Sequence, residues 1–600
     1  MFFNRRKNAV TRWKVVDNMF LSLLITGAII EFSQVGAAFI DGIVISRFLG
    51  PEAMAANGIA HPIYSIVGVI SGLIATGMQV TCSQLMGRGN TKDLNRYFSQ
   101  SVYLGTALSV LGAILLIIFA APFAVILGAS GNAAELVTPA ADYLRGFGFG
   151  IPPFVLVAII APAFQLDSGR KVIQTGAIIA SVTDIVFDIA AVYCGLGIFG
   201  VGLATALSNY FNLIYLVIQF FRKKDRMLRF VKPDVPLGDY VKMLSNGTEK
   251  ATRRLTNVIR PVILNTVIIS YGGSVAMTAL SIRNNFCNFT EIAASGIAAA
   301  VSLLCGLYYG EVNGEAIGEV KSCEWKSTAL SSTVICAALI VLSKPIVNLY
   351  TSDETILPMA VFAIIMLGLQ NALQTLLKSR ISYLQAISKP LNLNLLVFSS
   401  QLVFVVLSAI VLGNIFGTYG ILASFFVSDA LSLAAVYIYY QIKTHRLVPG
   451  KDALLNLPPE FSLSPGDVIS VDVRDQDDVT TTSEQIQMFC RGHKYDSKTS
   501  YYASLAFEEI AANIIQYGFP KNKKKDPIID LRVVALKDSL VIRIRDDCPH
   551  FDITKRIAEI NENDDDPASG LGIRITSKIA KNIEYTHAFE TNNIIITYDV

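Results

Sequence analysis

LGPEAMAANGIA, at residues 49–60, returns in altered form as GGSVAMTALSIR at residues 272–283. Five positions of the two segments match at one constant offset: Gly50 with Gly273, Ala53 with Ala276, Met54 with Met277, Ala56 with Ala279 and Ile59 with Ile282. The same offset holds further along for two more pairs, Gly87 with Gly310 and Asn90 with Asn313. Because glycine and asparagine keep this register as well as apolar residues, we predict that the chain contains a duplicated unit.

The duplicated unit has the composition of a membrane domain. Of the 600 residues 52% are hydrophobic and only 16% are charged, whereas soluble proteins average roughly 25% charged residues. Crossing a ~30 Å hydrocarbon layer takes about 20 helical residues, and apolar stretches of that length recur six times before residue 222 and six times between residues 250 and 441. We therefore predict an all-α polytopic protein of twelve transmembrane helices, with one six-helix lobe at 1–221 and a second at 222–445.

The end of the chain is of a different kind. Residues 461–600 make up less than a quarter of the chain and yet hold 40 of its 97 charged residues. After a Pro-containing linker at 446–464, short alternating runs such as VISVDV, LVIRIRD and NIIITYDV replace the long apolar stretches. This pattern predicts a soluble α+β domain at 465–600. It has no G-x-x-x-x-G-K-[ST] sequence, which excludes a P-loop motor, and its net negative charge excludes a basic nucleic-acid binder.

Orientation follows from the loops, because Lys and Arg in short loops stay on the cytoplasmic side. Alternate connections carry the basic residues, and the connections between them are nearly free of Lys and Arg. The basic connections include Arg88, Lys92 and Arg96; Arg170 and Lys171; Arg222, Lys223, Lys224, Arg226 and Arg229; Lys321 and Lys326; and Lys378, Arg380 and Lys389. We predict a multi-pass protein of the cell membrane with both termini in the cytoplasm.

Three carboxylates interrupt the apolar stretches of the first repeat. A charged side chain inside a span costs about 2.5–3.5 kcal/mol on insertion scales and usually faces a cavity or a partner. Asp41 lies late in the first stretch, and Asp184 and Asp188 lie one helical turn apart in the fifth. Gln34 shares the face of Asp41, and Thr205 lies in the sixth stretch. We expect a polar pocket in the outer half of the first lobe. The alternative is that these carboxylates reach the outer membrane interface or make structural hydrogen bonds between helices.

The second repeat contributes arginines instead. Arg253, Arg254 and Arg380 lie near cytoplasmic ends, where long side chains ordinarily extend to the membrane surface. Arg260 and Arg283 lie deeper, and we expect them either to line the second lobe or to pair with Glu249 or Glu291.

These motifs resemble the MATE (multidrug and toxic compound extrusion) family over about residues 1–445. The resemblance is carried by DGIVISRFLGPEAMAANGIA from Asp41, by the G-x-G-N loop at 87–90, and by DIVFD before GIFGVGLATAL. It implies exchange of sodium ions or protons for organic, often cationic solutes. It also implies that Asp41 and Asp188 are cation-coupling carboxylates and that Thr205 is the polar residue of the sixth helix. Asp184 departs from the family, because many members have Asn there.

The tail carries its own ordered series of polar residues. Glu509 and Asn513 are i and i+4 on one predicted helix, a spacing at which an amide oxygen binds Mg²⁺ beside a carboxylate. Asp546 ends a predicted strand. Gly570 and Gly572 open a predicted helix, where backbone N–H groups can approach a phosphate.

This series resembles the N, G1 and G2 boxes of GHKL-type ATP-binding domains, most closely those of the anti-sigma-factor serine/threonine kinases. The resemblance implies Mg-ATP as a cofactor, with Glu509 as catalytic base, Asn513 as Mg²⁺ ligand and Asp546 as adenine reader. Gly570 and Gly572 would then belong to the phosphate lid. Cys548 departs from the pattern, because the G1 motif has glycine at that position.

The sequence therefore predicts a secondary-active efflux antiporter with a cytoplasmic ATP-binding domain that regulates it or acts as a serine/threonine kinase. Its expected partners are a small organic solute, the lipid bilayer and a cytoplasmic protein substrate or regulator, and not nucleic acid. Two alternatives stay open: a membrane-tethered kinase or sensor without transport, and a flippase for a lipid-linked intermediate.

Overall fold

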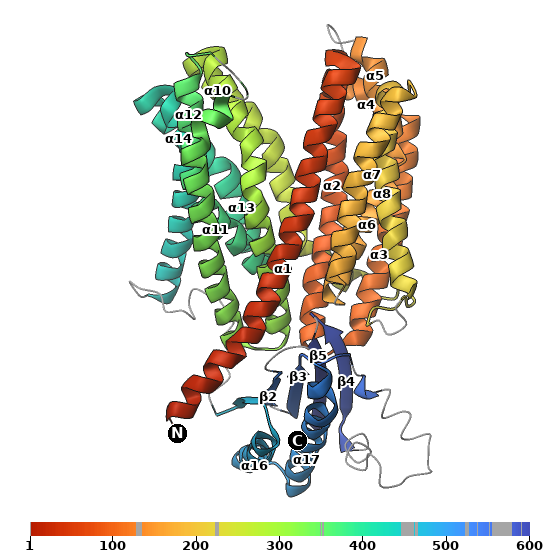
Figure 1. The fold of residues 1–600 in the computed structure, drawn as a ribbon, viewed down its shortest axis with the longest axis vertical. Coiled ribbons are helices and arrows are strands. Elements are labelled where there is room, and N and C mark those ends of the chain that lie inside the picture. The colour runs from red at the N-terminus through yellow and green to blue at the C-terminus, as the bar shows by residue number, and fades with distance from the viewer. Residues whose placement is uncertain are drawn as a thin grey trace.

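The computed structural model describes residues 2–127, 135–167, 169–222, 227–348, 350, 353–445, 461, 466–522, 527–536, 538–550, 552–554, 579–589 and 591–599. The chain forms two helical bundles side by side, with a sheet and two helices at one end of both (Figure 1). The first bundle comprises α1 (Phe2–Val44), α2 (Gly50–Gly87), α3 (Thr91–Ile118), α4 (Ala120–Ile126), α5 (Val137–Gly148), α6 (Ile151–Leu166), α7 (Arg170–Tyr193) and α8 (Gly197–Arg222).

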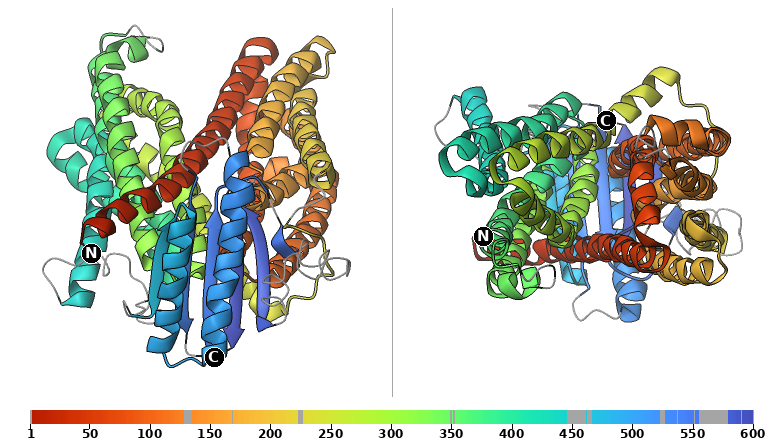
Figure 2. Two further views of the ribbon diagram at one scale, coloured as in Figure 1. Left: turned by 60° about the horizontal axis from the view of Figure 1, so that its bottom comes forward. Right: turned by 90° about the horizontal axis from the view of Figure 1, so that it is seen from above.

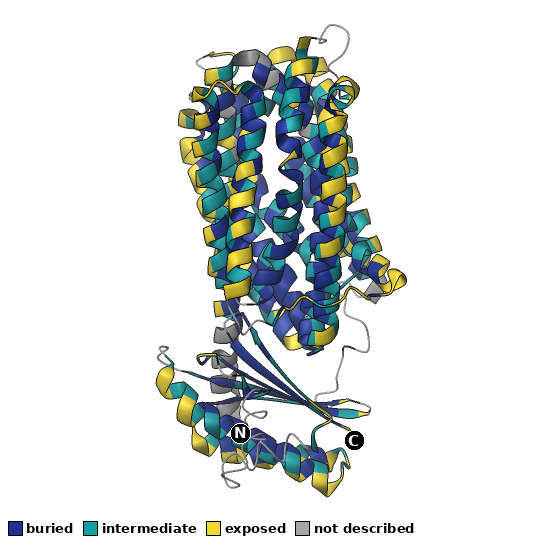
Figure 3. Ribbon diagram, turned by 90° about the vertical axis from the view of Figure 1, so that its right-hand side faces the viewer, coloured by how far each residue is buried: buried dark blue, intermediate teal, exposed yellow. Residues whose placement is uncertain are grey.

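A short helix, α9 (Leu237–Ser245), leads from the first bundle to the second. The second bundle comprises α10 (Thr248–Gly310), α11 (Gly314–Asn348), α12 (Leu357–Ala386), α13 (Pro390–Phe398) and α14 (Phe404–Thr444). One π-helical turn follows α1, at Ile45–Leu49, and another joins α13 to α14, at Ser399–Val403. Large exposed side chains such as Leu111, Phe221 and Val341 cover the outer helices, as expected of surfaces that face lipid (Figure 3).

The described residues contain nine helices long and apolar enough to cross a membrane, and the bent pair α5 and α6 makes a tenth span. Two of the nine are far longer than one crossing needs. α10 has non-helical backbone at Gly273 (φ 57°), and the run Pro390–Ile442, which comprises α13, the π-helical turn and α14, has it at Gly417 (φ 59°). Glycine adopts this conformation at no steric cost, so each of these two runs is divided at its glycine into two spans. The prediction of twelve spans in two sets of six is confirmed.

The repeat is also visible in the loops that face the sheet. Gly89 (φ 75°) follows α2, and Val312 (φ 53°), its counterpart in the repeat register, follows α10 in the same left-handed conformation. Each loop then ends in an asparagine that caps the next helix. Asn90 Oδ1 accepts from Asp93 N at 3.0 Å, and Asn313 Oδ1 accepts from Ala316 N at 3.1 Å. The duplicated unit predicted from the sequence thus has the same loop geometry in both copies.

The two bundles touch closely at the end that carries the sheet. A Cβ atom added to Gly87 would lie 2.9 Å from the Cα atom of Gly310, and one added to Gly310 would lie 3.0 Å from the Cα atom of Gly87. Gln84 Nε2 also crosses between the bundles, donating to Ala386 O at 2.6 Å. Backbones can approach this closely only where no side chain separates them, so the repeated glycine is a packing requirement.

The C-terminal domain is a sheet covered on one side by two helices (Figure 2). Its elements are β1 (Val468–Val473), α16 (Gln476–Gly492), α17 (Ser497–Asn513), β2 (Ile529–Leu536), β3 (Ser539–Asp546), β4 (Asn582–Ala588) and β5 (Thr591–Asp599). The strand order is β1-β2-β3-β5-β4 and every pairing is antiparallel. Alternate strand residues such as Ile542, Ile544 and Ile596 form one core with Phe507 and Ile510 of α17. The α+β prediction is confirmed.

The packing of α5 against α8 generates a stability prediction. A Cβ atom at Gly202 would lie 2.6 Å from Tyr143 O and 2.9 Å from Phe147 N, whereas a Cβ atom at Gly112 meets nothing within 4 Å. Gly202→Ala should destabilise the protein by about 1–3 kcal/mol through overpacking, and Gly112→Ala, also in a helix, should not. The thermal midpoint in detergent, followed by fluorescence-detected size exclusion, measures the difference. Equal midpoints for the two variants would contradict the packing described.

Candidate functional site

The first lobe gathers its three carboxylates between α1 and α7. Asp184 and Asp188 stand one turn apart on α7 and are buried, with exposures of 6% and 0%. Asp41 lies near the end of α1, with its carboxyl group beside that of Asp188. The structure therefore brings together the three acidic residues that the sequence analysis identified.

The three carboxylates differ in their partners. Asp184 Oδ1 accepts a hydrogen bond from Ser208 Oγ of α8 at 3.0 Å, and the Thr205 hydroxyl also lies beside it. In the described part of the chain, Asp41 Oδ1 and both Asp188 oxygens are buried with no hydrogen-bond partner. Because an unpaired buried charge is expensive, two adjacent carboxylates without donors form a site that demands a proton or a metal cation.

The polar residues around this centre match the expectations in part. Thr205 lies next to Asp184, as described above. Gln34 is exposed, and among the described residues it makes no hydrogen bond to the three carboxylates. Ser208 was missed, although it lies three residues after Thr205 and therefore on the same face of α8.

The second lobe contains a buried series of hydrogen-bonded polar side chains, which includes an arginine and an amide as well as a carboxylate. Arg283 of α10 donates to Gln370 Oε1 of α12 at 2.5 Å, and Gln370 Nε2 donates to Asp429 Oδ2 of α14 at 2.7 Å. The guanidinium also stacks on Phe425, 3.7 Å from the ring centre. Asp429 escaped the sequence analysis although an acid within an apolar span was a usable signal.

Of the two expectations for the deep arginines, lining the second lobe or pairing with Glu249 or Glu291, the pairing is not found among the described contacts. Glu249 pairs with Arg253 at 3.1 Å, and Glu291 pairs with Lys378 at 3.0 Å. Arg260 instead donates to Gln401 Oε1 at 2.8 Å. The partners are the uncharged amides of Gln370 and Gln401. The position of a residue on its own helix does not show which residue of another helix it will contact.

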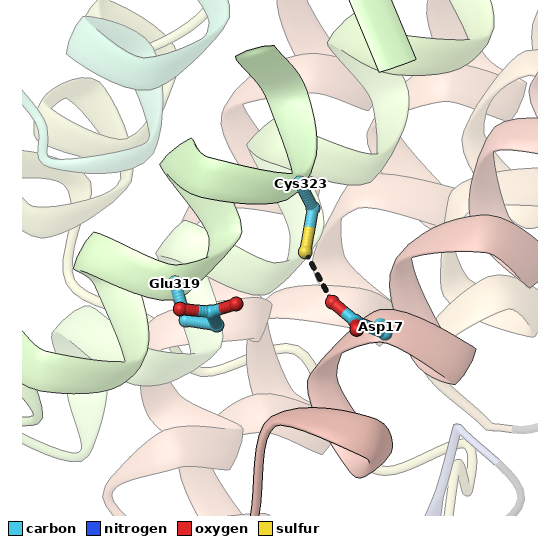
Figure 4. A group of neighbouring side chains, drawn as sticks. All are labelled: Asp17, Glu319 and Cys323. Atoms are coloured by element: carbon cyan, nitrogen blue, oxygen red, sulfur yellow. Dashed lines mark hydrogen bonds between the residues drawn. The ribbon is translucent and has the colours of Figure 1, made fainter. Parts of the chain in front are cut away.

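A third polar group joins the two lobes near the sheet. Asp17 of α1 meets Glu319 and Cys323 of α11, and their oxygen and sulfur atoms lie within 4.8 Å of one another. The Cys323 thiol donates to Asp17 Oδ1 at 2.8 Å (Figure 4). Because Asp17 and Cys323 belong to different repeats and lie far apart in the sequence, spacing along the chain could not reveal this contact.

The tail places Glu509 and Asn513 on one helix and Asp546 at the end of a strand. Glu509 and Asn513 lie on α17, half-buried, at the point where the helix passes into a π-helical turn at Ile514–Gly518. Asn513 Nδ2 donates to the Glu509 carbonyl at 2.7 Å. This bond uses only the amide nitrogen, so the amide oxygen is available for a magnesium ion.

Asp546 ends β3 and is buried, and burial raises its pKa. Its Oδ1 accepts from Cys548 N and from Asn592 Nδ2, both at 2.9 Å. Asn592 Oδ1 accepts in turn from the Tyr585 hydroxyl at 2.7 Å. Asn592 was missed because only the pairing of β3 with β5, which sets Asp546 opposite Asn592, brings it to the site.

Cys548 stands where the family pattern has glycine, and the structure accommodates it. Its side chain is buried against Gly518, where an added Cβ atom would lie 3.1 Å from Cys548 Sγ. Burial raises the pKa of the Cys548 thiol, which keeps it neutral. The other two predicted nucleotide residues, Gly570 and Gly572, lie outside the described residues.

Comparison with known proteins matches both halves of the chain to family models. The MatE model matches residues 28–190 and 252–411, one segment in each lobe and just over half of the chain in total. The model of the histidine kinase-like ATPase domain matches residues 473–598.

The chain is also similar to the multidrug export protein MepA. MepA from Staphylococcus aureus strain bovine RF122 / ET3-1 is 23% identical over 419 residues, covering 67% of this chain and 90% of MepA. MepA from Staphylococcus haemolyticus strain JCSC1435 is 23% identical over 431 residues, covering 70% and 92%.

Solved structures share the fold of the helical part. A MOP superfamily transporter from Pyrococcus furiosus aligns with a TM-score of 0.66 and 20% identity, covering 74% of this chain and 97% of that one. A variant of the Vibrio cholerae MATE transporter VcmN aligns with a TM-score of 0.66 and 15% identity, covering 72% and 98%. Residues 1–445 thus have the fold, the internal repeat and the matching family model of one class of membrane transporter, and the chain belongs to the MatE family, with a histidine kinase-like ATPase domain at its C-terminus.

Proposed function

We propose that the protein is a secondary-active antiporter that exports organic solutes in exchange for sodium ions or protons. The observation that carries this proposal is the pair Asp41 and Asp188, whose buried oxygens have no donor in the described structure. The similarity to proteins named multidrug export proteins supports drug-like, organic solutes as the cargo.

The coupling step follows from electrostatics at this pair. Two adjacent carboxylates in a low-dielectric site repel one another, so the site gains a cation when it faces the side where the cation is abundant. Loss of that cation restores the repulsion and favours a different packing of α1 against α7. Asp184 and Thr205 complete an all-oxygen surrounding, which suits a hard cation as well as a proton.

The membrane orientation belongs to the same proposal. We place the sheet and both termini in the cytoplasm, because the loops that face the sheet carry Arg88 and Lys92, whereas segment 195–199 at the other end of the helices has no Lys or Arg. We place the lobes at 1–221 and 222–445, the linker at 446–464 and the soluble domain at 465–600.

The tail is proposed to bind Mg-ATP and to regulate the transporter. Asn513 would hold Mg²⁺, Asp546 would accept from the adenine amine, and Gly570 and Gly572 would contact phosphate. Support comes from the family match and from the Asn513 amide oxygen, which accepts no hydrogen bond from the described residues. Bound ATP would supply a transferable phosphoryl group, and Glu509, one turn from Asn513, would orient a hydroxyl nucleophile. A serine/threonine kinase activity is therefore the second candidate function.

The first test concerns coupling. Asp41→Asn and Asp188→Asn each remove a charge that the coupling cation neutralises, so gradient-driven export should fall to background while the protein still inserts in the membrane. Dye transport in inverted vesicles, driven separately by sodium and by proton gradients, measures this and identifies the ion. Asp142→Asn is the control, because Asp142 is partly exposed and pairs with Arg145 on its own helix. Normal export by both Asn variants would remove these residues from the mechanism.

The second test concerns the energy source. A transporter with its own buried acidic pair needs no ATP, so a chain truncated after residue 455 should still export solute along an ion gradient. The same vesicles, prepared without nucleotide, give the rate. A truncated protein that inserts correctly and yet exports nothing under a full gradient would make the tail an obligatory part of the transporter.

The third test concerns nucleotide binding. Asn513→Ala removes the metal-binding oxygen, so the magnesium-dependent affinity of the full-length protein for a fluorescent ATP analogue should fall by roughly tenfold or more. Asp546→Asn should weaken adenine binding, because an acceptor-only group gains donors. Glu509→Gln should bind normally but lose hydrolysis or phosphotransfer. Gln476→Ala, on the exposed first turn of α16, is the control, and binding that ignores Asn513→Ala would contradict the site.

A further inference from the structure

The face of the sheet that α16 and α17 leave uncovered is packed against the membrane domain (Figure 1). Because side chains alternate between the two faces of a strand, Ile542 and Ile544 of β3 point toward the helices and Arg543 and Arg545 point the other way. Both arginines are nevertheless buried, with exposures of 7% and 4%. An antiparallel sheet often leaves one face to water, and this one does not.

The second lobe supplies the acid that these arginines need. Arg543 Nη1 lies 3.2 Å from Glu311 Oε2, and Arg545 Nη2 donates to Glu311 Oε1. Arg532 of β2 donates to the carbonyl of Val312, the residue with the left-handed backbone, at 3.1 Å. Glu311 itself is 6% exposed, so this is a desolvated, charge-assisted contact and not a surface ion pair.

The first lobe meets the same face through its equivalent loop. Arg543 Nη2 donates to the carbonyl of Gly87 at 2.5 Å. A Cβ atom at Gly89 would lie 2.8 Å from Ile595 Cδ1. The Glu584 carboxylate lies beside the same loop, since a Cβ atom at Gly89 would be 3.2 Å from Glu584 Oε2, and the N-terminus of α3, which follows, favours a negative charge there.

One side chain therefore holds both lobes. The Arg543 guanidinium bonds Gly87 of the first lobe and Glu311 of the second at the same time. The fixed fork of a guanidinium suits it to two acceptors in a set geometry. These acceptors can share one guanidinium only while the loops lie as close together as the Gly87 and Gly310 backbones do here. If the lobes separated at this end, Arg543 would have to release one of them.

We infer that the C-terminal domain is a latch: its sheet grips the repeat-related loops of both lobes, and Arg543 joins them, so that the docked tail stabilises the conformer closed at this end and opposes its opening. The partner of this surface is the transporter half of the same chain. The inference does not depend on which ion or solute is transported, nor on whether the tail binds ATP.

The latch also adjoins the candidate nucleotide site. Arg545 donates to Asn593 Oδ1, and the next pair along β3 and β5 is Asp546 with Asn592, whose side chains lie on the opposite face. A shift of β3 and β5 would therefore move the arginines on one face and Asp546 with Asn592 on the other. This arrangement can couple the separation of the lobes to the candidate nucleotide site.

The test measures the distance between the lobes in the full-length protein. Spin labels go on Lys92→Cys of α3 and Gly318→Cys of α11, both exposed positions near the start of their helices, in a background carrying Cys194→Ser, which removes the exposed native cysteine. Distance distributions are recorded in lipid nanodiscs for the labelled parent, Arg543→Gln, Glu311→Gln and Arg491→Gln. Arg491, exposed on α16, is the matched arginine control.

We expect the population with separated lobes to rise by roughly tenfold or more in Arg543→Gln and Glu311→Gln, because losing one partner of a buried charge pair typically costs more than a decade in affinity. Arg491→Gln should match the parent. If Arg543→Gln does not fold, Glu311→Gln, a change on the transporter side, decides alone. Unchanged distances in every folded latch variant, or an equal rise in Arg491→Gln, would overturn the inference.

Discussion

Lipid offers no hydrogen bonds, and most features of this protein follow from that constraint. Each span satisfies its own backbone as helix, and the two long helical runs are divided at Gly273 and Gly417, where glycine adopts the left-handed conformation. Polar side chains that enter the spans must then find hydrogen-bond partners within the protein. Arg283, Gln370 and Asp429 do so in the second lobe. Asp41 and Asp188 lie side by side, but in the described structure Asp41 Oδ1 and both Asp188 oxygens receive no hydrogen bond, and this makes the first lobe a candidate for cation binding.

The soluble domain divides two roles between the faces of one sheet. On the helix side, Asn592 donates to Asp546, the residue proposed to bind adenine. On the other side, Arg543 and Arg545 meet Glu311. A domain attached by a linker alone would leave such arginines in water. Their burial shows that the tail is packed onto the transporter as part of one folded structure.

The local sequence pattern and the repeat register predicted the twelve spans, the duplicated loops and the grouping of Asp41, Asp184 and Asp188. Each of these features depends on a short segment or on a constant offset between two segments. Contacts between distant segments could not be predicted in this way. Asn592 reaches Asp546 only through strand pairing, and Glu311 reaches Arg543 only through docking of two domains. For Arg260 and Arg283 the sequence left pairing with an acid open beside lining the second lobe, and spacing could not indicate the amides of Gln401 and Gln370, which other helices bring to them.

The two repeat-related loops that contact the sheet differ in charge, although they come from a duplicated unit. Arg88 and Glu311 occupy the same position in the two copies, yet Arg88 is exposed and Glu311 is buried under two arginines. Two identical loops would present the same charge at both contacts, whereas the single sheet contacts the two loops through different residues. The two copies differ in charge at this position, and in the described structure only the copy with Glu311 forms the ion pairs with the sheet. In a relative that lacks the tail, nothing in this contact would keep the two residues different.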